Sequence, residues 1–206
     1  MAAVTAIVLV PLTYLALVVA GVESGAATLW APGFAAVLLA VALARDARTP
    51  ATPADVNRRP LLWRGAVMVV LVLLFESIAA GVIGGYAPVA ATDGPHSHPV
   101  QLHDALITML GLPIVMFLIF RLGVWSSRWL AGPHPLVWLA AIALSSRAIR
   151  LLLSWPAATY AEPRNLVIYG LGYTLVRNAI LAVLIFCLLA LGNRHGHRRN
   201  ANTADA

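Results

Sequence analysis

The amino-acid sequence predicts an all-α, polytopic integral membrane protein with six transmembrane helices and both termini in the cytoplasm. Composition is the first observation: 61% of the 206 residues are hydrophobic and only 11% are charged, whereas soluble domains are roughly 25% charged. With a mean hydropathy of +0.85, a water-soluble fold of this length could not bury so much apolar surface. The spacing of the apolar segments and the distribution of arginine are the second and third observations.

Six segments are long and apolar enough to cross a bilayer, whose hydrocarbon core of about 30 Å requires roughly 20 helical residues. Gly21 to Gly25 separate the first two segments, which predicts a tight turn and a helical hairpin. Residues 1–192 are therefore expected to form a single transmembrane domain, and 193–206 a basic, disordered cytoplasmic tail. The predicted spans are 3–21, 26–44, 65–85, 102–120, 135–155 and 166–191.

Each span has its own justification along the chain. The first lacks the positively charged start of a signal peptide, so we expect it to be retained. The second ends where charges resume at Arg45, and the third contains one charged residue, Glu76. The fourth follows a loop rich in histidine and proline. The fifth contains Arg147 and Arg150, and the sixth contains Arg177, so three arginines lie inside predicted spans.

The remaining arginines test the number of spans. The three regions opposite the termini hold only Arg164. This asymmetry fits the positive-inside rule and places both termini in the cytoplasm of a cell membrane, expected to be a bacterial inner membrane. The net charge of +6 then reflects topology and contacts with anionic lipids at the cytoplasmic face, and nucleic acid is not an expected partner. Ten arginines fall in the regions on the side of the termini, which are 45–64, 121–134 and 193–206.

The charged residues inside the spans are the best candidates for a substrate-binding site. Counting from the predicted span ends places Glu76, Arg147 and Arg177 near the midplane, with Arg150 one turn further out on nearly the same face as Arg147. Charges at this depth are costly and usually face the bundle interior with a partner. The three arginines carry two more positive charges than Glu76 can neutralise. One positive charge remains in excess even if Asp104, at the outer end of the fourth span, offsets one of them.

Two explanations of these charges remain open beside an anion or proton site. One is a structural ion pair that locks the helices, and the other is arginine side chains that extend toward the lipid headgroups. The positive excess favours a bound anion, because the planar guanidinium donates two parallel hydrogen bonds to phosphate or carboxylate. We expect the neutral side chains of Ser145, Ser146, Tyr173 and Asn178 to lie nearby.

The segment TDGPHSHPVQLH, residues 92–103, is a second candidate site. His96, His98 and His103 could bind Zn or Cu(II), but their spacing matches no specific metal motif, so solvated loop histidines or a proton relay are alternatives. These twelve residues resemble the loop before a helix-borne histidine in heme A synthases. The resemblance would imply axial haem ligation by His103 alone, because no other histidine lies inside a predicted span, and no haem function is carried over.

Three functions are compatible with these features. The first is a small permease for an anionic or proton-coupled solute, which requires no cofactor and predicts a central cavity lined by the midplane charges. The second is an enzyme acting on a lipid-linked or phosphate-bearing substrate. The third is a non-catalytic subunit or assembly factor, bound to other membrane subunits or to copies of itself. The chain has no nucleotide-binding, zincin or serine-hydrolase motif, so we expect transport rather than catalysis.

Overall fold

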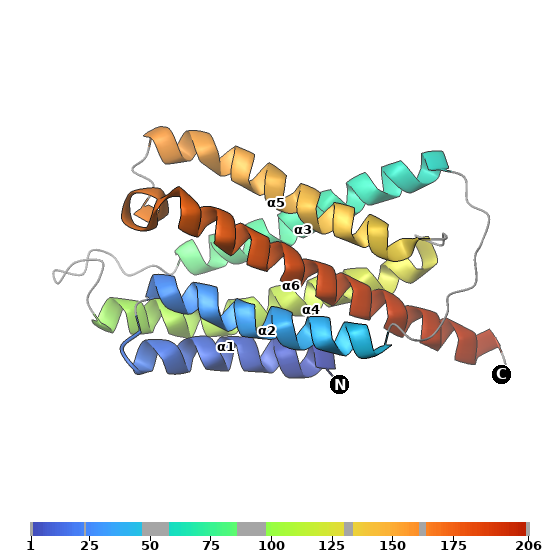
Figure 1. Ribbon diagram of the computed structural model, residues 1–206, viewed down its shortest axis with the longest axis horizontal. Helices are drawn as coiled ribbons and strands as arrows, with labels where there is room; N and C mark the ends of the chain where they lie inside the picture. The colour runs from blue at the N-terminus through green and yellow to red at the C-terminus, as the bar shows by residue number, and fades with distance from the viewer. Residues whose placement is uncertain are drawn as a thin grey trace.

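The computed structural model is all-helical over the residues that it describes, and it contains no strand there (Figure 1). The described residues are 2–22, 24–46, 58–85, 98–129, 134–160 and 164–204, with side chains described for 4–22, 30–44, 62–77, 111–128, 134–153, 172 and 174–200. The helices are α1 (Ala2–Val19), α2 (Ser24–Asp46), α3 (Arg58–Gly85), α4 (His98–Trp129), α5 (Pro135–Tyr160) and α6 (Arg164–Ala204).

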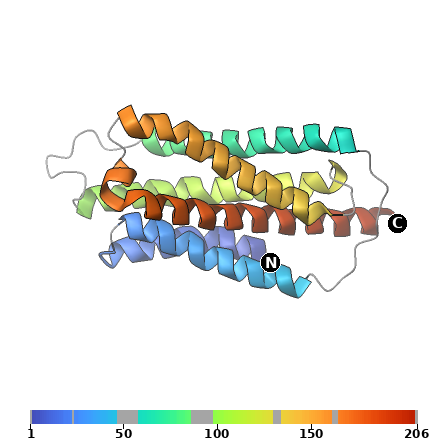
Figure 2. The ribbon, with the colours of Figure 1, turned by 45° about the horizontal axis from the view of Figure 1, so that its top comes forward.

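The helices pack as three layers of two (Figure 2). The central layer is formed by α4 and α6, which share the most extensive contact in the molecule. On one side α1 packs against α4 and α2 against α6, and on the other side α3 packs against α4 and α5 against α6. Successive helices run in opposite directions, so the first and last helical residues lie toward the same end of the bundle (Figure 1).

The predicted hairpin between α1 and α2 is closed by a glycine in the left-handed region. Gly21 has a φ of +85°, which favours a residue without Cβ. The Gly21 N–H donates to the Val18 carbonyl and the Val22 N–H donates to the Leu17 carbonyl. These two bonds satisfy carbonyl groups that the end of α1 would otherwise leave unpaired, as in a Schellman motif.

Three glycines bring the backbones of α4 and α6 into direct contact. A Cβ at Gly123 would lie 2.8 Å from the Cα of Leu189, and one at Gly192 would lie 2.9 Å from the amide nitrogen of Val124. A Cβ at Gly196 would overlap the side chain of Ser127. Gly192 and Gly196 are one turn apart, so this is the small-residue spacing that allows close helix packing in membranes.

Polar side chains fix the register of the same interface. The Nδ2 of Asn193, a buried residue, donates to the Oγ of Ser126 at 2.8 Å. The Nη1 of Arg194 donates to the Leu43 carbonyl at 2.8 Å, in the last turn of α2. This bond joins α6 to the end of α2.

Several polar regions that the sequence analysis assigned to loops are helical. α3 begins at Arg58, α4 begins at His98 and continues to Trp129, and α5 extends to Tyr160. The basic tail also differs from the predicted disorder, since α6 continues to Ala204. Hydropathy indicates only which part of a helix can contact lipid. A helix continues as long as its backbone hydrogen bonds and its packing continue, and α6 still packs against α4 at Gly196.

Three described segments are long and apolar enough to span a membrane, namely Gly111–Arg128, Pro135–Leu153 and Thr174–Asn200. Large apolar side chains also cover the outside of the bundle, an arrangement that water does not favour and lipid does. These features suggest a membrane protein. Representative residues that are at least half exposed are Val8, Phe34, Val70, Phe117, Leu152 and Val176.

Candidate functional site

An ion pair between α3 and α5 is the centre of the candidate site. The Nη2 of Arg147 donates to the Oε2 of Glu76, and the two side chains are only 10% and 15% exposed. The residues are 71 positions apart in the sequence and meet across the contact between α3 and α5, which pass over each other in Figure 1. The similar depth that the residue count gives for these two charges is therefore matched by direct contact.

A second contact lies next to the first on the same two helices. The Nη1 of Arg150 donates to the Oγ of Ser77 at 3.3 Å. Arg147 and Arg150 are three residues apart on α5, so they project from adjacent turns of one face toward two consecutive residues of α3. The α3–α5 contact thus presents two guanidinium groups to one carboxylate and one hydroxyl.

Arg177 brings the central layer into the site. It is half-buried on α6 and lies within electrostatic range of Arg147, as Arg150 does. Among the side chains that the structure describes, Glu76 carries the only carboxylate. Three of the four described candidate residues are therefore positive and one is negative, and they come from three different helices.

One donor of Arg147 is not used by the protein. Arg147 as a whole residue is 8% exposed, and its Nε–H has no hydrogen-bond partner. A buried donor without a partner is rare and costs about 1–3 kcal/mol. The guanidinium therefore has one edge occupied by Glu76 and a further donor that an oxygen-bearing ligand could satisfy.

The neutral side chains predicted near the site are mostly engaged within their own helices. The Ser146 Oγ donates to the Ala143 carbonyl at 2.8 Å, and the Asn178 Nδ2 donates to the Thr174 carbonyl at 2.8 Å. Ser145 is exposed, and the side chain of Tyr173 lies outside the described residues. Hydrogen bonding to a ligand would therefore come chiefly from the arginines.

The remaining predicted site residues are not brought to this cluster by what the structure describes. Three of them lie in the first part of α4, for which the structure describes the backbone but not the side chains: His98, His103 and Asp104. His96 lies outside the described residues. Because α4 begins at His98, that histidine belongs to a helix rather than to the predicted loop, whereas His103 was already expected on the fourth span. Their spacing of five residues separates their Cα positions by roughly 140° around the helix axis. No metal-binding group occurs among the described residues.

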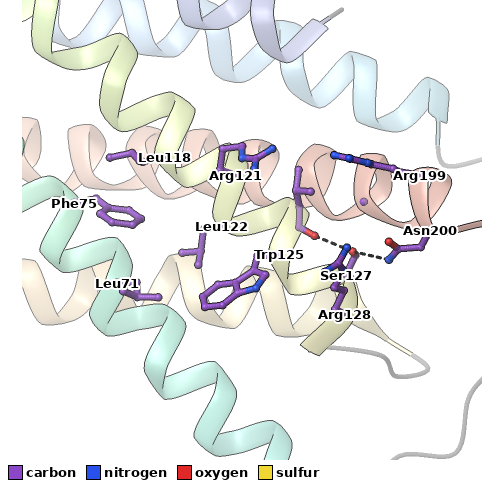
Figure 3. Close-up of a pocket in the computed structure, with 12 residues that line it drawn as sticks. Leu71, Phe75, Leu118, Arg121, Leu122, Trp125, Ser127, Arg128, Arg199 and Asn200 are labelled. Atoms are coloured by element: carbon purple, nitrogen blue, oxygen red, sulfur yellow. Dashed lines mark hydrogen bonds between the residues drawn. The ribbon is translucent and has the colours of Figure 1, made fainter. Parts of the chain in front are cut away.

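A cavity of about 410 Å³ lies between α3, α4 and the last turns of α6 (Figure 3). None of Glu76, Arg147, Arg150 and Arg177 lines it, although Phe75 does. The central cavity that the permease hypothesis predicts is thus not this one, whose α6 lining is limited to Gly196, Arg199 and Asn200 near the end of that helix.

Sequence reasoning missed the cavity because it ended the fourth span at residue 120. Arg121 and Arg128 were assigned to a loop and used only for topology. In a continuous α4, residues 121, 125 and 128 recur at the i, i+4, i+7 spacing of one helix face. That pattern of arginine, tryptophan and arginine was the available signal. Ser77 was also missed, although it directly follows Glu76.

Comparison of the chain with models of protein families, with curated proteins and with solved structures finds no match. The function is therefore argued from the residues themselves.

Proposed function

We propose that this protein is a six-span permease of the cell membrane that carries an anionic solute together with a proton. Arg147, Arg150 and Arg177 hold the anion, and Glu76 carries the proton; Asp104 remains a further candidate at the outer end of α4. The observation that supports the proposal is the buried guanidinium of Arg147, which is paired with Glu76, has a free Nε–H donor and lies near two more arginines.

The ion pair supports a direct coupling between proton and anion. While Glu76 is ionised, it occupies one edge of the Arg147 guanidinium. When the carboxylate takes up a proton, it no longer neutralises Arg147, and a guanidinium at membrane depth requires another anion. A phosphate or carboxylate of the solute can then accept parallel hydrogen bonds from the same group. Proton and anion therefore bind together and leave together.

The layered packing supports a movement linked to this exchange. Arg147 and Arg150 belong to the outer layer of α3 and α5, whereas Arg177 belongs to the central layer. Positive groups facing each other between α5 and α6 repel, and an anion between them reverses the sign of the interaction. Binding would therefore draw the two layers together, and release would let them separate, as alternating access requires.

Binding and transport are tested on the purified chain. Thermal stability is measured for the wild type and Arg147→Gln with phosphate, sulfate, chloride and small carboxylates, each at several pH values. Stabilisation of the wild type by one anion class, lost in Arg147→Gln, is expected because a ligand that binds only the folded state stabilises it. Arg198→Gln, which removes an exposed arginine on α6 outside the cluster, is the matched control and should keep the response.

Proton coupling is tested in proteoliposomes with the anion that binds. Uptake should follow an imposed pH gradient in the wild type and lose that dependence in Glu76→Gln, because the amide cannot carry a proton. If no anion stabilises the wild type while Glu76→Gln and Arg147→Gln both unfold readily, the charges form a structural lock. The protein would then be better described as a non-catalytic subunit of a membrane complex.

A further inference from the structure

The cavity beside α4 has an apolar half that lies deep in the bundle. Its walls are formed by two residues of α3 and by α4 residues spaced at helical intervals, and Figure 3 shows these side chains grouped together away from the end of α6. Phe75 immediately precedes Glu76, so this half reaches the predicted midplane of the bilayer. The apolar lining residues of the cavity are Leu71, Phe75, Leu118, Leu122, Val124 and Trp125.

The other half of the cavity is basic. Arg128 on α4 and Arg199 on α6 line it, Arg121 lies between Leu118 and Leu122 on α4, and no carboxylate lines either half. Arg121 and Arg128 are seven residues apart, which separates them by about 10 Å along one helix face. Two neutral side chains lie between the basic groups: the Nδ2 of Asn200 donates to the Oγ of Ser127 at 3.5 Å (Figure 3).

The lining thus changes along the helix axis from a mainly apolar interior, in which Arg121 is the charged residue, to a charged end at Arg128 and Arg199. Lipids have the same polarity, with acyl chains at membrane depth and phosphate at the interface. Trp125 is 45% exposed and lies about one turn before Arg128, a position that tryptophan favours at the boundary between hydrocarbon and headgroups. The volume of about 410 Å³ lies within the range of about 300–1,000 Å³ typical of small-molecule sites.

We propose that this cavity is a binding site for one anionic phospholipid, with an acyl chain along Leu71 and Phe75 and the headgroup phosphate held by Arg121 and Arg128. Guanidinium groups bind phosphate with paired, charge-assisted hydrogen bonds. An entirely positive rim favours a headgroup with a net negative charge over a zwitterionic one. A free phosphate ion could use the arginines but not the apolar half, so the lipid is the occupant that fits both. This proposal requires that the protein lies in a membrane, but it does not depend on the proposed transport function.

The test uses the purified full chain in detergent and measures thermal shifts with three probes. These are a short-chain phosphatidylglycerol, a phosphatidylcholine with the same chains, and glycerol phosphate without chains. Phosphatidylglycerol should stabilise the protein most, and its apparent affinity should fall by about tenfold or more in Arg121→Gln and in Arg128→Gln, since each removes a charge-assisted hydrogen bond. Arg198→Gln removes the same charge from an exposed position on α6 that does not line the cavity, and it should change the affinity by less than about threefold.

Three results would overturn the assignment. Equal stabilisation by phosphatidylglycerol and phosphatidylcholine would mean that the arginines do not select the headgroup. Equal loss of affinity in Arg128→Gln and Arg198→Gln would indicate diffuse attraction to the basic end instead of a site. Stabilisation by glycerol phosphate as strong as that by the lipid would show that the cavity takes a soluble phosphate and that its apolar half is not used.

Discussion

Replacing either partner of the Glu76–Arg147 ion pair should lower the free energy of unfolding by an amount that reflects the burial of the pair. An exposed ion pair contributes about 0.2–1 kcal/mol, whereas removing one partner of a buried pair costs about 3–5 kcal/mol. The two side chains here are 10% and 15% exposed, so the buried figure is the relevant one. A lone charge at membrane depth costs about 2.5–3.5 kcal/mol on the insertion scale, which sets each single substitution near 3 kcal/mol.

The order of the two single variants follows from their neighbours. Arg147→Gln leaves Glu76 with Arg150 and Arg177 nearby as positive groups. Glu76→Gln instead leaves the Arg147 guanidinium facing two groups of the same sign. We therefore expect Glu76→Gln to lower the free energy of unfolding more than Arg147→Gln does.

The double variant completes the cycle. With both charges removed, two amides remain that can hydrogen-bond to each other, and such bonds inside membranes contribute about 0.6 kcal/mol on average. The double variant should thus lose about 1 kcal/mol, less than either single variant. Unfolding free energies from SDS titration in lipid bicelles measure all four proteins. Additive losses, or a smaller loss for Glu76→Gln than for Arg147→Gln, would refute the account of a buried pair among like charges.

Three further substitutions test the packing, each by thermal melting of the purified protein. Gly192→Ala should lower the free energy of unfolding by about 1–3 kcal/mol, because its Cβ would overlap the α4 backbone. Gly172→Ala is the control: no atom lies within 4 Å of its Cβ, so the change should be neutral or slightly stabilising. Equal effects of the two changes would rule out the close contact at Gly192. Gly21→Ala should cost roughly 1 kcal/mol because its φ is +85°, and no loss would mean that the turn adopts another conformation. Arg194→Ala should cost about 1–2 kcal/mol by removing the charge-assisted hydrogen bond that joins α6 to the Leu43 carbonyl of α2, with partial rescue by Arg194→Lys; an unchanged melting temperature would contradict that role.

The ion pair illustrates how far the sequence leads toward the site. Counting residues from the ends of apolar segments gives depth, since a helix rises about 1.5 Å per residue, and depth matched Glu76 with Arg147. Counting does not give the rotation of each helix or its neighbours. The hydrogen bond from Arg150 to Ser77 and the approach of Arg177 from α6 depend on those quantities. The site's use in binding stays a prediction.

The sequence by itself determined that the chain is helical and apolar enough for membrane insertion, because composition and the length of apolar runs are local properties. It also located the α1–α2 turn, where glycine permits a positive φ. Tertiary structure alone decided the pairing of the layers, the extension of α4 and α6 beyond their apolar segments, and the cavity that they form with α3. These features arise from contacts between residues distant in the sequence, such as Gly192 with Val124, and hydropathy carries no information about such contacts.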